Sequence, residues 1–119
     1  DLMTSRIHIN RCTFTDAGDK GVSVGEGTQL NIANSTFDTC VIGIEIKDSS
    51  KATVTKSTRF RNCGIGINLY RKNLRYVDGG TLDATDLDIE GSTTQDIKWD
   101  KRSTVPAHLK QRIRPGQKQ

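Results

Sequence analysis

The sequence predicts an all-β fold: a right-handed single-stranded parallel β-helix of about four rungs, with a short basic C-terminal tail. Three observations favour this fold. Apolar positions recur at long, nearly constant spacings, apolar and polar residues alternate inside each repeat, and small polar or glycine-rich clusters separate the alternating segments. The composition agrees, because 33% hydrophobic and 5% aromatic residues suit the narrow core of a repeat better than a compact globular core.

Equivalent apolar residues return once per repeat. Ile7, Leu30, Ala52 and Leu82 follow one another at spacings of 23, 22 and 30 residues. Four further columns keep this register: Ile9, Ile32, Val54 and Ala84; Phe14, Phe37, Phe60 and Ile89; Val22, Ile44, Ile67 and Ile97; and Val24, Ile46, Leu69 and Trp99. Each circuit of a parallel β-helix lies about 4.8 Å above the last, so these columns predict ladders of like side chains inside the coil.

The period inside a rung is two, which is typical of a strand. Residues 42–46 and 65–69 alternate isoleucine or leucine with other residues, and this alternation sends neighbouring side chains to opposite faces. The polar and glycine-rich clusters at 34–36, 48–50 and 78–80 suit turns between strands. No helical period of 3.6 residues precedes the tail.

The three cysteines are predicted to be buried free thiols. Cys12, Cys40 and Cys63 are an odd number at wide spacing, without the paired spacing of a zinc site. Cys40 and Cys63 each follow a ladder phenylalanine by three residues, which places them in one column. Stacked parallel neighbours point the same way, so this column favours packed thiols over a disulfide.

Residues 35–46 (Ser-Thr-Phe-Asp-Thr-Cys-Val-Ile-Gly-Ile-Glu-Ile) and their echo at 57–69 resemble the right-handed β-helix repeats of the pectate-lyase-like superfamily. The resemblance covers residues 7–103 and implies the fold. It implies no single activity, because the superfamily includes lyases, hydrolases, epimerases, phage tailspikes and non-catalytic coils. Residues 19–26, 46–50 and 70–76 are also similar to β-helix segments of secreted bacterial proteins with a CotH-like kinase domain. No kinase motif is present, so phosphotransfer is not carried over.

An insertion at residues 71–80 separates the third and fourth rungs, and loops on rigid scaffolds commonly carry binding residues. Its cations, amide and aromatic rings suit contact with a sugar or a carboxylated polysaccharide. The predicted carbohydrate-binding residues are Tyr70, Arg71, Lys72, Asn73, Arg75, Tyr76 and Asp78. The alternative is a solvated loop with Tyr76 folded against the coil. The lyases that this chain resembles use Arg or Lys to remove a proton beside a uronate, assisted by Ca²⁺; we identify no catalytic residue here.

Two further groups of polar residues are candidates. Asp83, Asp86, Asp88 and Glu90 supply oxygen ligands that Ca²⁺ prefers, but calcium needs six to eight oxygens, and carboxylates about 6.6 Å apart along a strand do not converge unaided. We therefore predict no metal site and no cofactor, with Ca²⁺ as the alternative. The outward column Ser23, Glu45, Asn68 and Lys98 predicts either a shallow glycan-binding groove or a merely soluble sheet face.

Residues 1–103 are predicted to form the β-helix rungs, as a fragment of a longer solenoid or larger protein, and residues 104–119 a basic tail. Residues 1–97 hold 11 Lys/Arg and 13 Asp/Glu, whereas residues 98–119 hold 7 and 1, so nucleic-acid binding by the body is not favoured. In the tail, residues 106–114 place Leu109 and Ile113 four apart after Pro106, which predicts either a short helix covering the last rung or a basic linker. No segment has the length and hydrophobicity of a membrane span.

The function expected from these features is a non-catalytic β-helix module of a secreted or envelope-associated bacterial protein, acting as a rigid spacer or a polysaccharide-contacting surface. One alternative is a fragment of a lyase or epimerase acting on acidic polysaccharide, with Arg71, Lys72, Tyr76 and Asp78 as the first residues to mutate. Another is polyanion binding by the tail. The partners expected are polysaccharide or neighbouring domains of the parent protein, and uncapped solenoid ends predict end-to-end self-association.

Overall fold

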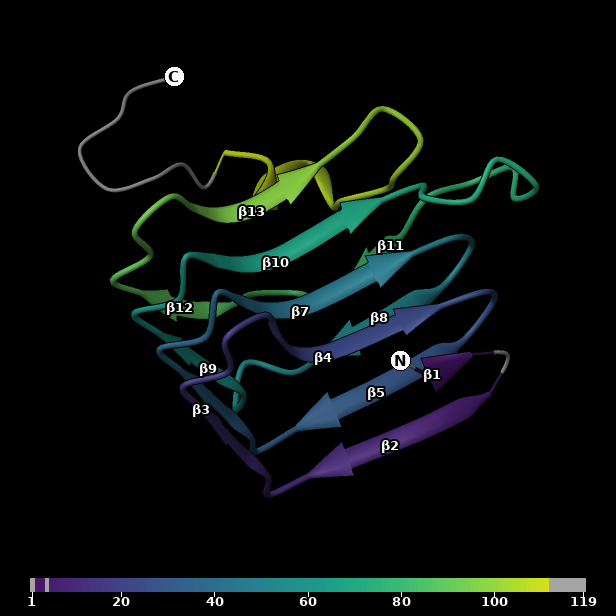
Figure 1. Cartoon of the computed structure of the whole chain (residues 1–119). Coiled ribbons are helices and arrows are strands. Elements are labelled where there is room, and N and C mark those ends of the chain that lie inside the picture. Colours follow the sequence, from purple (N-terminus) through teal and green to yellow (C-terminus); the bar gives the residue numbers. More distant parts are fainter. Residues whose placement is uncertain (1, 4, 112–119) are drawn as a thin grey trace.

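The computed structural model describes residues 2, 3 and 5–111 of the chain, with residues 2 and 3 described as backbone only. In this part of the chain the strands form three parallel sheets, and successive rungs lie on top of one another (Figure 1). Each full rung contributes one strand to every sheet, in the order B, C, A. The predicted parallel β-helix of about four rungs is therefore confirmed.

Sheet A has the strand order β1-β4-β7-β10-β13, with bounds Leu2–Met3, Lys20–Gly25, Ile42–Lys47, Ile65–Tyr70 and Gln95–Trp99. Sheet B has the order β11-β8-β5-β2, with bounds Thr81–Asp83, Lys51–Val54, Gln29–Ala33 and Arg6–Asn10. Sheet C has the order β12-β9-β6-β3, with bounds Asp88–Glu90, Arg59–Arg61, Thr36–Asp38 and Thr13–Thr15. The 3₁₀-helix η1 spans Ala107–Leu109.

The core consists of the predicted ladders. Phe37 lies parallel to Phe14 and to Phe60, with ring centroids 4.7 and 5.0 Å apart. Glycines in sheet A make room for this column, because a Cβ at Gly43 would lie 2.7 Å from the Phe60 ring of the next rung. The aliphatic ladders pair in the predicted register, as with Val22, Ile44, Ile67 and Ile97, and their members are at most 7% exposed. Stacking of like on like therefore forms one continuous core.

One corner repeats the same backbone conformation in all four rungs. Asp16, Thr39, Asn62 and Gly91 each adopt a positive φ between sheets C and A. The first three donate their N–H groups to carbonyls of the rung above, at 3.0, 2.9 and 3.0 Å. The backbone N–H groups at this corner are thus hydrogen-bonded from one rung to the next. These bonds offset the strain that a left-handed conformation imposes on residues other than glycine.

The described part of the tail covers the last rung. The N–H of Leu82 donates to the carbonyl of Thr104, and the N–H of Thr104 donates to Gly80, at 2.9 and 2.8 Å. Val105 and Leu109 are 4% and 2% exposed. The helix in this segment is a single 3₁₀ turn. Ile113 and the basic residues from Arg112 onward lie outside the described residues.

The thiol ladder is confirmed, with one correction. Cys40 and Cys63 are buried free cysteines at equivalent positions, and their Sγ atoms lie 3.5 and 3.6 Å from the carbonyls of Phe14 and Phe37. Burial raises the pKa of the Cys63 thiol. The prediction that Cys12 is buried is wrong: it is exposed, because it precedes its phenylalanine and aligns with the corner residue Ser35 rather than with the thiol column.

Candidate ligand-binding surface at the end of sheet A

Two carboxylates fix the base of the loop between β10 and β11. Oδ1 of Asp48 accepts the backbone N–H groups of Lys72 and Asn73, at 2.7 and 2.8 Å. Oδ2 of Asp100 accepts the backbone N–H of Arg71 at 2.8 Å. Asp48 is buried and follows β7, whereas Asp100 follows β13, so the loop is tied both to the rung below and to the rung above. From this base the loop projects away from the coil (Figure 1).

Some of the predicted site residues shape the loop itself. The guanidinium of Arg71 donates to the carbonyl of Tyr76 at 3.3 Å. Oδ1 of Asn73 accepts the backbone N–H of Arg75 at 3.0 Å, and Tyr76 donates its N–H to the carbonyl of Asn73 at 3.1 Å. Tyr76 is half-buried, which leaves its ring partly folded against the molecule. The side chains left exposed to solvent are those of Lys72, Arg75 and Asp78.

A pocket of about 550 Å³ lies between this loop and the turn that ends β7. Leu74 contributes an apolar wall and is 79% exposed, and the nearby Val77 is 72% exposed. Lys47 reaches across β4 because Gly25 has no side chain: a Cβ there would lie 2.9 Å from Cε of Lys47. The pocket is lined by Gly25, Glu26, Lys47, Asp48, Lys72, Asn73 and Leu74.

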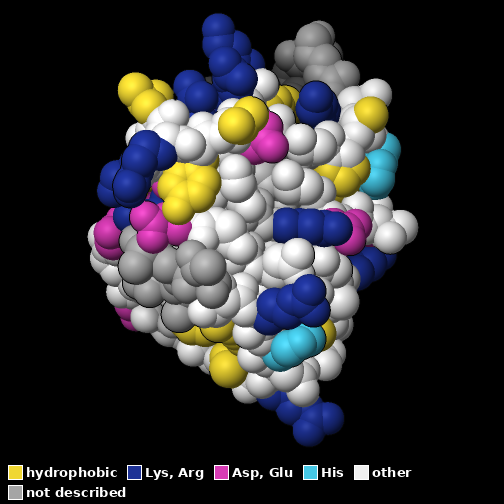
Figure 2. Space-filling view, turned by 90° about the vertical axis from the view of Figure 1, so that its right-hand side faces the viewer, with side chains coloured by type: hydrophobic (Ala, Val, Ile, Leu, Met, Phe, Trp, Pro, Cys, Tyr) yellow, Lys and Arg dark blue, Asp and Glu magenta, His cyan; other side chains and the backbone are white. Residues whose placement is uncertain are grey.

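Cationic and apolar side chains occur together on this side of the molecule. Figure 2 shows the face onto which the loop projects, with Lys and Arg side chains beside hydrophobic ones in its upper part. A sugar ring presents a weakly polar face and a hydroxyl rim, so a surface of this mixture can contact both. The sequence missed Leu74 and Val77 because an apolar residue in a loop matches no repeat position.

Beside the pocket, a buried carboxylate lies on the outer face of sheet A. Glu45 is only 2% exposed although its side chain points away from the core. Its Oε1 lies 3.4 Å from Nζ of Lys20 and 3.7 Å from Nζ of Lys47. Oε1 also accepts the hydroxyl of Ser23 at 3.4 Å, and Oε2 accepts Nδ2 of Asn68 at 3.3 Å. The carboxylate is therefore compensated by two cations and two hydrogen bonds, as a buried charge requires.

The surroundings of Glu45 test two expectations about the outward column of sheet A. The predicted outward column is confirmed, because Ser23, Glu45, Asn68 and Lys98 pair in register. The expectation that these positions simply face solvent is wrong for Glu45, because the lysine side chains fold over it. Lys20 and Lys47 were not predicted from sequence, since alternation tells which face a residue occupies but not what covers it.

The electrostatic environment on the outer face of sheet A favours the protonated forms of Lys20 and Tyr70. The Glu45 carboxylate raises the pKa of Lys20. Burial raises the pKa of the Tyr70 phenol, and the negative charge of Glu45 adds to this effect. Tyr70 and Lys20 therefore remain hydrogen-bond donors at neutral pH, which suits binding of hydroxyl or carboxylate oxygens.

The acidic residues considered for Ca²⁺ are engaged with cations or hydroxyls. Asp86 lies 3.2 Å from Nζ of Lys56. Asp88 and Glu90 lie 2.9 and 3.5 Å from Nη2 of Arg61. Oδ2 of Asp83 accepts the hydroxyl of Thr53 at 3.4 Å. Within residues 2, 3 and 5–111, no three His, Cys, Asp or Glu side chains gather as a metal ion would require.

The comparison with protein families decides the fold family. The right-handed β-helix region profile matches residues 2–98. The chain belongs to the right-handed β-helix family. Searches among curated proteins and solved structures found no match. Family membership explains the ladders but names no ligand, because this β-helix fold serves many functions. No helix in the described part of the chain is long and apolar enough to cross a membrane.

Proposed function

We propose that this β-helix is a non-catalytic binding module that contacts acidic polysaccharide in a secreted or envelope-associated bacterial protein. The contact surface is the outer face of sheet A together with the loop at 71–80. The β-helix supplies a rigid base, and the loop supplies the exposed cations and apolar side chains. The polysaccharide, the location and the bacterial source belong to the proposal.

The pocket beneath the loop is the observation that carries this proposal. It combines the apolar wall of Leu74 with the ammonium group of Lys72 and the polar side chain of Asn73. An acidic sugar matches this combination, because its ring packs on the leucine while its carboxylate pairs with the ammonium. The loop base is held by two hydrogen bonds to the buried residue Asp48, so little ordering is needed when a ligand binds.

Calorimetry with oligogalacturonate and oligoalginate tests this function on the intact chain. We expect Lys72→Ala to weaken binding about tenfold, a loss of about 1.4 kcal/mol. Leu74→Ala should weaken binding as well, because it removes the apolar wall. Binding should also weaken as salt concentration rises, since the cations are exposed.

Arg11→Ala is the matched control. Arg11 is an exposed cation in the turn between β2 and β3 of the first rung, so its removal changes the net charge equally but lies away from the loop, which follows β10 in the third rung. We expect unchanged affinity in this variant. Equal losses in Lys72→Ala and Arg11→Ala would show that only overall charge matters and would reject a defined site. Absence of binding by the wild-type chain to these oligomers and to a wider glycan array would reject the function.

A polysaccharide lyase is the second candidate. The observation that favours it is the buried carboxylate of Glu45 between two lysines, next to Tyr70. Against it, the raised pKa of Tyr70 keeps the phenol protonated at neutral pH, so it is not available as a general base. Unsaturated product formed from polygalacturonate or alginate by the wild type, and lost in Glu45→Gln or in Arg71→Ala with Lys72→Ala, would establish the lyase and displace the binding module.

A further inference from the structure

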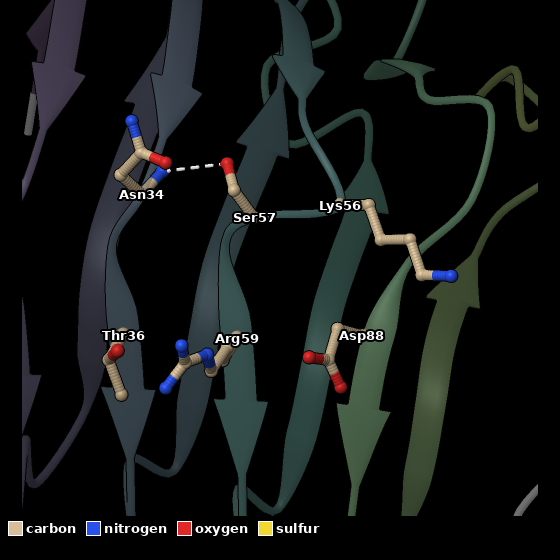
Figure 3. Close-up of a pocket in the computed structure, with 6 residues that line it drawn as sticks. All are labelled: Asn34, Thr36, Lys56, Ser57, Arg59 and Asp88. Carbon is tan, nitrogen blue, oxygen red and sulfur yellow. Dashed lines mark hydrogen bonds between the residues drawn. The ribbon is translucent and has the colours of Figure 1, made fainter.

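The outer face of sheet C carries a second pocket, on a different side of the coil from the loop. Its volume is about 580 Å³, and it is lined by Asn34, Thr36, Lys56, Ser57, Arg59 and Asp88. Three of these residues form one outward column, because Thr36 pairs with Arg59 and Arg59 pairs with Asp88 across β6, β9 and β12. Figure 3 shows Arg59 between Thr36 and Asp88, with Lys56 and Ser57 above.

Arg59 differs from the other charged residues of this face. Arg61, two residues along the same strand, is held by Asp88 and Glu90 and also donates to two backbone carbonyls. Lys56 pairs with Asp86 at 3.2 Å. The carboxylate nearest to Arg59 in the column is thus already bound to Arg61. Among the residues that the structure describes, no acidic side chain forms an ion pair with Arg59, and its side chain is exposed.

The rim of the pocket is built from ordered polar groups. The backbone N–H of Asn34 donates to Oγ of Ser57 at 3.0 Å, and Nδ2 of Asn34 donates to Oδ1 of Asn10 at 2.9 Å. Oγ of Ser57 lies 2.6 Å from Oγ1 of Thr55. The side chain of Thr36 is partly exposed beside Arg59. Hydroxyl and amide groups at the rim of the pocket are therefore held in place by hydrogen bonds.

We propose that this pocket binds an anionic sugar unit, with Arg59 pairing with the carboxylate or sulfate of the sugar. A guanidinium binds either anion through two parallel N–H donors. Thr36 and Ser57 line the same pocket and offer hydroxyl groups to the ring hydroxyls. This site shares no lining residue with the pocket beneath the loop, so it stands or falls independently of the function proposed above.

Nuclear magnetic resonance titration of the intact chain tests the site. The probes are glucuronate, glucose 6-sulfate, glucose and inorganic sulfate. We expect the two anionic sugars to shift the backbone amides of Thr36 and Arg59, and glucose to have no effect. The stronger of the two anionic sugars identifies the preferred anion. Inorganic sulfate should bind at least tenfold more weakly than the better sugar, because it lacks the ring hydroxyls (a difference of about 1.4 kcal/mol).

Variants separate this site from general charge effects. Arg59→Ala should abolish the shifts, and Arg59→Lys should weaken binding about tenfold, because a lysine does not reproduce the two-pronged contact. Lys72→Ala removes the same charge at the loop and should leave these shifts unchanged. Binding equal to wild type in Arg59→Ala would overturn the proposal, as would equal affinity for inorganic sulfate and both sugars. Loss of binding in Lys72→Ala alone would instead assign the ligand to the loop.

Discussion

The two ends of the coil differ in how completely they cover the core ladders. At the C-terminal end, Val105 and Leu109 lie over the last rung and are almost fully buried. At the N-terminal end, Ile7, Ile9 and Phe14 are only partly buried, although their partners one rung above are at most 2% exposed. The strands β2 and β3 also form the edges of sheets B and C there. One end of the described coil is therefore capped and the other is open.

This difference shows that the segment that caps the coil is a structural feature distinct from the repeated rungs. The cap consists of a bridge between Thr81 and Thr104 followed by one 3₁₀ turn, and it shares no residue pattern with the rungs. It covers apolar core at that end, while β12 and β13 stay the edge strands of sheets C and A. We consequently expect the open end of one copy not to associate with the capped end of the next. Growth of open-ended assemblies is disfavoured for the same reason. Self-association of the described coil through its ends would therefore pair two open ends.

Removal of the cap should have the largest effect. A chain that ends at Ser103 loses the burial of Val105 and Leu109, about 1.5–3 kcal/mol each, so its free energy of unfolding should fall by about 3–6 kcal/mol. With both ends open, it should also form assemblies that grow with concentration. Urea denaturation and light scattering measure the two effects. A chain that ends at Gln111 keeps the described cap and is the control; equal stability and equal size in both truncations would refute a capping role.

Shortening the aromatic ladder should distinguish its middle from its open end. Phe37 is fully buried between two rings, so Phe37→Ala should cost about 3–5 kcal/mol. Phe14 has a ring on one side only and is partly exposed, so Phe14→Ala should cost roughly half as much. Urea denaturation of the two variants gives the comparison. Equal losses would mean that the first rung is as well covered as the second.

The sequence was sufficient to predict the ladders, because they result from apolar residues that recur periodically along the chain. One apolar residue per circuit, at spacings of 22 or 23 in the first three rungs, defines a register that the strand pairings confirm. The insertion at 71–80 was equally visible as an interruption of this spacing. These features follow from alternation and repetition, which depend only on the order of residues.

The candidate site was less accessible to sequence reasoning. Burial of Glu45 depends on where the long side chains of Lys20 and Lys47 settle, and the strand pattern does not specify this. Arg71 matched the chemistry of a ligand-binding residue, yet its guanidinium bonds the loop backbone. Arg59 stood out only after the ion pairs of Arg61 were known. Side-chain contacts between rungs depend on the tertiary structure, so a periodic sequence pattern does not predict them.

The open end can be tested directly for self-association. Ile9→Lys places a charge on the partly buried apolar surface of β2, so it should remove any dimer formed through this end. The free energy of unfolding of the monomer should change by less than about 1 kcal/mol, because the lysine head can reach water from the edge of the coil. Analytical ultracentrifugation of wild type and variant measures this. Dimers of equal strength in both would place the contact elsewhere.

Asp100 connects the loop to the capped end, and its titration should give the smallest effect. Burial of this carboxyl opposes ionisation, but hydrogen bonds from the N–H of Arg71, the hydroxyl of Ser103 and the N–H of Arg102 outweigh it and lower the pKa of Asp100. A lowered folded-state pKa stabilises the protein above the unfolded-state pKa of about 3.9, and this stabilisation is lost as pH falls through the folded-state pKa.

Asp100→Asn should therefore lower the free energy of unfolding by about 1–2 kcal/mol at pH 7, because it removes the charge that strengthens these hydrogen bonds. The difference between wild type and variant should shrink as the pH falls below about 4, where the wild-type carboxyl takes up its proton. Urea denaturation at pH 7 and at several lower values measures the difference. Asp78→Asn removes an exposed carboxyl from the same loop and is the control for the loss of a negative charge there. A constant difference between wild type and Asp100→Asn at all pH values would show that the charge of Asp100 does not link the loop to the cap.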